Sequence, residues 1–125
     1  MDLERQIKYW RNGSKEDIAA AEILINKGCF RHGLFFAHLA IEKILKAHVV
    51  RTTGEVPPYI HNLVRLAEVA ELPLDAERLD LLRRFNLYQL AGRYPDQGKA
   101  QIDDGAAMDR LAQMKEMTEW LAAKL

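Results

Sequence analysis

The feature that most constrains this 125-residue chain is the run GLFFAHLAI at residues 33–41, which is apolar almost all the way round a helix. Such a helix must be enclosed by other elements on several sides, because no face of it suits water. Small residues recur along it at helical spacing, where a second helix can approach closely. They are Gly33, Ala37, Ala40 and Ala47. We therefore expect residues 30–51 to form an enclosed helix.

Helix-breaking residues divide the rest of the chain into further blocks with the periodicity of helices. In the first block, Asn12-Gly13-Ser14 allows one bent helix or two short ones, and we favour one, with Ser14 and Asp17 resembling a capping box. No segment alternates with period two, so no sheet is expected. The sequence predicts an all-α, up-and-down bundle of four or five helices in a single domain, residues 1–125. The other expected helices span residues 3–26, 60–70, 76–91 and 103 or 104 to 124, with a loop at 92–101.

Charge and composition limit the kinds of function. Lys plus Arg and Asp plus Glu both number 18, so any contact with nucleic acid must come from a local basic patch. Cys29 is the only cysteine, which excludes an internal disulfide and a cysteine-based zinc site within one chain. No apolar run resembles a signal peptide or a membrane span. We expect a cytoplasmic protein with no metal and no cofactor.

Two histidines are candidates for structural roles, and one of them, His38, also has a functional interpretation. His38 lies in the apolar run, where a buried neutral imidazole is the simpler reading. Alternatively, Arg31 lies seven residues earlier on the same helix face, and such a pair can cleave RNA by proton transfer from the 2′-hydroxyl and charge stabilisation at phosphorus. His61 follows a Pro-Pro turn, and we expect it to act as an N-cap substitute that orders the turn.

Two polar groups can serve at a binding surface. Glu42, Lys43 and Lys46 lie on the more polar side of the second helix, either as a solvated face or at a dimer interface or ligand cleft. The loop Arg93-Tyr94-Pro95-Asp96 precedes a helix whose N-terminal amides attract anions, and Lys99 is nearby. The loop is therefore either a phosphate site or a structural turn with Arg93 paired to an acid.

Several of these segments together resemble the HEPN family of small helical domains. They are the A-x-x-A-x-E-K-x-L-K-A pattern from Ala37 to Ala47, the His61-Asn62-Leu63 segment, the Arg93-Tyr94-Pro95 loop and the E-D-I-x-x-A stretch from Glu16 to Ala21. The resemblance covers nearly the whole chain. It implies a helical bundle that forms homodimers with a cleft between protomers, and often a minimal nucleotidyltransferase encoded alongside as a partner.

The resemblance also bears on activity. Ribonucleolytic HEPN members are similar to one another in an Arg followed by four to six residues and a His, just before the last helix. Here Arg93 matches that Arg, but Tyr94 replaces the usual polar neighbour and no His follows. The Arg31 and His38 pair has the spacing at a different place in the chain, which we interpret as coincidence.

These observations favour a homodimeric HEPN-like domain that binds nucleotide or RNA phosphate and acts with a nucleotidyltransferase in a toxin–antitoxin-type module. In this hypothesis Arg93, Lys99 and Arg31 supply positive charge, and Tyr94 supplies a stacking face. One alternative is a metal-independent ribonuclease toxin that uses Arg31 and His38. A second is a non-catalytic dimeric adaptor that docks a partner protein through an exposed apolar patch.

Overall fold

The first two helices form a long antiparallel hairpin. In the computed structural model, which describes residues 2–93 and 103–125, α1 spans Leu3–Asn26 and α2 spans Phe30–Thr53. The Arg5 amide donates to the Asp2 carboxylate at 3.2 Å and so begins α1. Glycines with positive φ follow both helices, Gly28 at 82° and Gly54 at 70°, a conformation that ends helices at little cost only for glycine.

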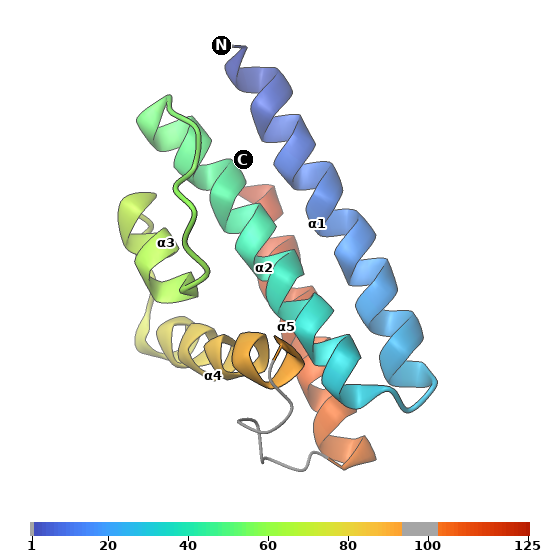
Figure 1. Cartoon of the computed structure of the whole chain (residues 1–125). Coiled ribbons are helices and arrows are strands. Elements are labelled where there is room, and N and C mark those ends of the chain that lie inside the picture. The colour runs from blue at the N-terminus through green and yellow to red at the C-terminus, as the bar shows by residue number, and fades with distance from the viewer. Residues whose placement is uncertain (1, 94–102) are drawn as a thin grey trace.

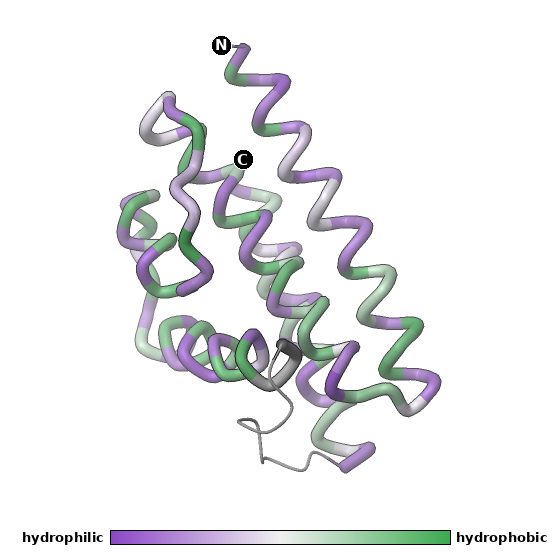
Figure 2. Tube along the Cα trace, in the orientation of Figure 1, coloured by the Kyte–Doolittle hydropathy of each residue, from purple (hydrophilic) through white to green (hydrophobic). Residues whose placement is uncertain are grey.

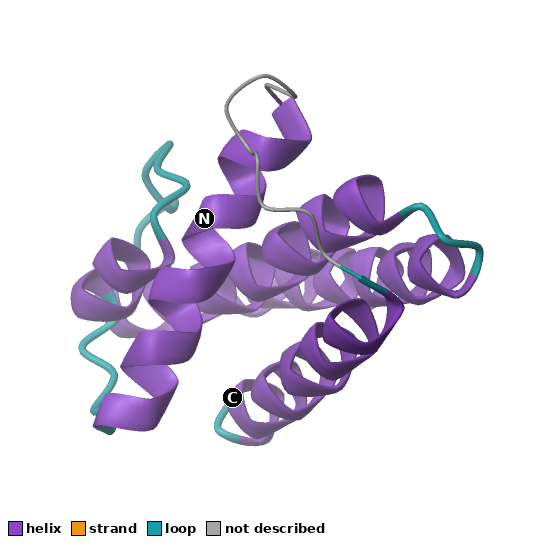
Figure 3. Cartoon of the chain, turned by 90° about the horizontal axis from the view of Figure 1, so that it is seen from below, coloured by secondary structure: helices purple, strands orange, loops and turns teal. Residues whose placement is uncertain are grey.

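Three further helices complete the described chain: α3 (Leu63–Val69), α4 (Ala76–Arg93) and α5 (Asp104–Ala123). Each begins at a side chain that accepts a backbone amide three residues on, namely Asn62, Asp75 and Asp103. Seen from below, the described residues form helices joined by loops, with no strand (Figure 3). The all-α prediction is therefore confirmed.

The helix α2 lies at the centre of the arrangement and contacts the other four helices. In Figure 1, α1 and α5 run alongside α2, while α3 and α4 lie on its other side and α4 crosses the direction of the bundle. Figure 2 shows that the first half of α1 is largely hydrophilic, whereas α2 carries more hydrophobic positions. The enclosed helix predicted from residues 33–41 is thus the central one.

Close packing between α1 and α2 depends on Gly33. A Cβ atom at this position would lie 2.5 Å from Cγ1 of Ile25 and 3.2 Å from the carbonyl oxygen of Ala21. The core continues on the other faces of α2, where large side chains from four helices are fully buried. They include Leu45, Leu66, Phe85, Met114 and Leu121.

Several local predictions need correction. The favoured single helix for the first block is confirmed, but Ser14 does not cap it, because Ser14 is buried and its hydroxyl donates to the Ala40 carbonyl at 2.7 Å. His61 is not the cap of the third helix, since the neighbouring Asn62 accepts the Arg65 amide at 3.0 Å. The helix α4 continues to Arg93, past the expected start of the loop at residue 92.

Candidate functional site

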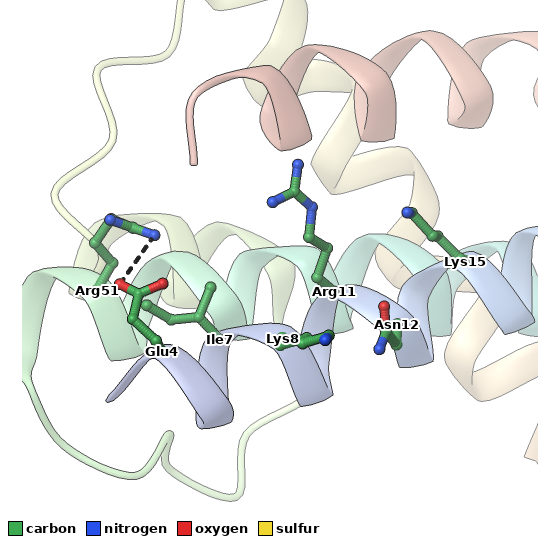
Figure 4. Close-up of a pocket in the computed structure, with 7 residues that line it drawn as sticks. All are labelled: Glu4, Ile7, Lys8, Arg11, Asn12, Lys15 and Arg51. Carbon is green, nitrogen blue, oxygen red and sulfur yellow. Dashed lines mark ion pairs between the residues drawn. The ribbon is translucent and has the colours of Figure 1, made fainter. Parts of the chain in front are cut away.

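An open groove lies along the N-terminal half of α1. It has a volume of about 370 Å³ and includes one residue of α2, Arg51. Its lining contains four cationic side chains and one carboxylate (Figure 4). The lining residues are Glu4, Ile7, Lys8, Arg11, Asn12, Lys15 and Arg51.

The helical repeat places the cations in one row. Lys8, Arg11 and Lys15 are spaced by three and four residues, which brings their side chains to the same side of α1. The buried face of α1, which carries Ile7 and Ser14, turns toward α2. Arg11 and Lys15 extend in the same general direction from α1 in Figure 4. The row therefore borders a concave surface instead of packing into the core.

Ion pairing neutralises one end of the groove only. Arg51 lies 3.6 Å from Glu4, and both side chains are largely exposed, so this pair contributes little to stability. No carboxylate in residues 2–93 or 103–125 forms an ion pair with Lys8, Arg11 or Lys15. A chain with zero net charge thus has a local positive surface that suits an anion.

A second polar cluster is buried on α2. The Glu42 carboxylate, only 4% exposed, accepts a hydrogen bond from Lys46 Nζ at 3.1 Å. Its other oxygen accepts from Nδ1 of His61 at 3.0 Å, and His38 Nδ1 lies 3.9 Å from that same oxygen. The ammonium of Lys46 also lies 5.3 Å from the centre of the Trp10 ring, within range of a cation–π contact.

These contacts indicate which ring nitrogen carries a hydrogen in His38 and in His61. Because a carbonyl oxygen only accepts, Nε2 of His38 donates to the His61 backbone carbonyl at 3.0 Å. In His61 the bond to Glu42 places the hydrogen on Nδ1, and the half-exposed ring presents Nε2 to its surroundings. The cluster holds the segment before α3 against α2. A carboxylate-oriented imidazole of this kind can also transfer protons.

The prediction that Glu42 and Lys46 form either a solvated face or a cleft is resolved only in part. A solvated face is wrong for Glu42 and Lys46, because both residues are buried, at 4% and 6% exposed. Lys43 is more accessible and forms an ion pair with Asp17 at 2.7 Å, which joins α2 to α1. A role for these residues in a dimer interface stays a prediction.

The structure does not bring Arg31 and His38 together as a site that RNA can reach. Arg31 is exposed at the start of α2, where its guanidinium donates to Nε2 of His32 at 3.3 Å. His38 lies two turns further along and is 0% exposed. The buried imidazole, the simpler of the two readings, is the one observed.

The predicted phosphate loop falls largely outside the described residues. Tyr94 and Lys99 lie in the undescribed range 94–102, and Arg93 is placed only as the last residue of α4. Their roles stay predictions. The groove on α1 was missed by the sequence reasoning, although the spacing of Lys8, Arg11 and Lys15 was a visible signal.

The comparisons with known proteins agree with this fold. The family described as "HEPN domain" matches residues 7–125, nearly the whole chain. The chain therefore belongs to the HEPN family, whose domains commonly dimerise. Neither the curated proteins nor the solved structures compared with the chain include a match.

Two kinds of feature are absent from the described residues. No helix among them has both the length and the apolar composition that a bilayer crossing requires. No group of three or more His, Cys, Asp or Glu side chains in residues 2–93 and 103–125 is arranged to hold a metal ion.

Proposed function

We propose that this HEPN domain binds phosphate groups of a nucleotide or RNA, as a homodimer that acts with a nucleotidyltransferase partner in a toxin–antitoxin-type module. The observation that carries the phosphate-binding part is the groove on α1, where three cations line one concave surface without a carboxylate partner among the described residues. Lysine and arginine hold phosphates through charge-assisted hydrogen bonds. The dimer and the partner protein rest on the family alone.

A charge reversal at Lys15 tests the groove. We expect Lys15→Glu to weaken binding of a fluorescent RNA oligonucleotide at least ten-fold in an anisotropy titration at low salt, because it replaces an attraction with a repulsion. The matched control is Lys27→Glu, which changes the net charge equally but lies twelve residues further along, about 18 Å from Lys15 on the helical rise of 1.5 Å per residue. Equal effects of the two variants would contradict a localised site.

The loop after α4 has a separate role in the proposal. Arg93, with Tyr94 and Lys99, would add a second phosphate contact and a stacking surface. We expect Arg93→Ala to weaken nucleotide binding in calorimetry while the melting temperature stays near that of the wild type. Unchanged binding in Arg93→Ala would contradict a phosphate contact from Arg93.

The ribonuclease alternative receives no support from the placement of its residues. A general acid–base histidine must come within hydrogen-bond reach of the substrate, and the His38 ring is fully enclosed. We therefore expect labelled RNA to stay intact when incubated in EDTA with the wild type and with His38→Gln alike. Cleavage by the wild type that His38→Gln abolishes would instead establish the enzyme.

A further inference from the structure

We propose that the groove on α1 binds consecutive phosphates of a single-stranded nucleic acid and reads neither the bases nor the sugar. This inference rests on the proposed phosphate-binding function and specifies its ligand. The site is formed by α1 and Arg51, at a distance along the chain from the loop after α4. Three properties of the groove support it: the length of its cationic row, the chemistry of its lining and its size.

The cationic row is longer than one phosphate group. From Lys8 to Lys15 the helix rises about 10.5 Å, at 1.5 Å per residue, with Arg11 between them. All three positions lie along one side of α1, but the ends of the Lys8 and Arg11 side chains extend in different directions in Figure 4, so their charges are spread apart. Charges distributed in this way match a ligand whose negative charges repeat along a chain better than a single compact anion.

The lining offers little that could recognise a base. It includes no aromatic side chain for stacking, and its one neutral polar side chain is the exposed Asn12. Sequence is read through hydrogen bonds to base edges, whereas contacts to phosphate only position the ligand. A site composed mainly of lysine and arginine therefore binds the backbone and distinguishes poorly between sequences or between RNA and DNA.

The size of the groove and its one ion pair set further limits on the ligand. A volume of about 370 Å³ is near the lower end for a small-molecule site, so the concavity accepts part of one strand and not a duplex. At one end Glu4 neutralises Arg51, which leaves three cations for phosphate. Glu4→Gln removes that carboxylate and frees Arg51 as a fourth.

The test measures anisotropy of fluorescent eight-nucleotide oligo(U) and oligo(dT) between 50 and 200 mM salt. With about 0.7 of a counterion released per phosphate neutralised, three contacts predict that the wild type weakens about 18-fold over this range, and four contacts predict about 50-fold for Glu4→Gln. We expect the two oligonucleotides to bind within three-fold of each other. A nucleoside triphosphate and a duplex of equal length should each compete at least ten-fold more weakly.

The outcomes separate this inference from the function on which it rests. Equal binding of the triphosphate and the octamer, both lost in Lys15→Glu, would overturn the single-strand inference and leave phosphate binding intact. Strong preference for RNA over DNA, equal binding of the duplex, or an unchanged salt dependence in Glu4→Gln would likewise overturn it. If none of these ligands binds the wild type at 50 mM salt, both proposals fail.

Discussion

Replacing Glu42 with leucine removes a buried carboxylate that two donors share. Lys46 is only 6% exposed. In Glu42→Leu its ammonium loses its only hydrogen-bonding partner among the described residues and keeps only the cation–π contact with the Trp10 ring. Loss of one member of a buried ion pair costs about 3–5 kcal/mol, because the remaining charge stays in a poorly solvated place. His61 is half-exposed, so water can replace its bond to the carboxylate.

That cost is a large part of the stability of a domain this size. Native domains are stable by roughly 5–15 kcal/mol, so we expect Glu42→Leu to lower the melting temperature by about 12–20 °C at ~4 °C per kcal/mol. Urea unfolding followed by circular dichroism gives the free energy directly. Glu4→Gln is the control, since it breaks an exposed pair and should cost less than about 1 kcal/mol.

A double variant identifies the cause. In Glu42→Leu/Lys46→Met no charge is left buried, and methionine can pack against the Trp10 ring, so most of the lost stability should return. A single variant that unfolds within about 0.5 kcal/mol of the wild type would show that the pair is unimportant. A double variant as unstable as the single one would show that the cost comes from packing and not from the unpaired ammonium.

Two further predictions concern pH and packing. Burial lowers the pKa of His48, whose Nε2 donates to the Leu121 carbonyl at 2.7 Å. The imidazole therefore takes up a proton more readily in the unfolded chain than in the folded one, so the free energy of unfolding should fall as pH drops below about 6.5. His48→Gln should flatten that dependence in melting temperatures measured from pH 5 to 8, and an unchanged slope would argue against it. Gly33→Ala should destabilise the protein by about 1–3 kcal/mol in urea unfolding, because the added Cβ would lie 2.5 Å from Cγ1 of Ile25. Gly105→Ala should be neutral or stabilising, because the nearest atom to its added Cβ, Oδ1 of Asp103, lies 3.6 Å away. Equal stabilities of the two variants would contradict the close packing at Gly33.

The helices could be predicted from the sequence because their signals are local. Periodic apolar residues and breakers such as Gly28, Gly54 and Pro73 act within a few positions, and the bounds of the first helix agree with the structure. The cap of α4 is equally local, since the Asp75 side chain accepts the backbone amide of Arg78 three residues on. The end of α4 at Arg93 lies two residues beyond the predicted end at residue 91, a difference that is usual at helix ends.

The burial of Glu42 and Lys46 could not be predicted in this way. Their spacing of four residues indicates only that they can pair, and an exposed pair is the usual case. What covers them comes from distant parts of the chain, Trp10 of α1 and His61 of the segment before α3. The groove depends likewise on tertiary structure, because Arg51 joins the row on α1 only once α1 packs on α2.

NMR can locate the phosphate-binding surface that we propose on α1 of this HEPN domain. Backbone amide shifts of the ¹⁵N-labelled wild type would be followed during titration with oligo(U) at low salt. We expect the largest changes to fall on residues 4–15 and Arg51, and we expect them to disappear in Lys15→Glu. Changes centred on His61 or on the C-terminal half of α5, with residues 4–15 unmoved, would contradict it.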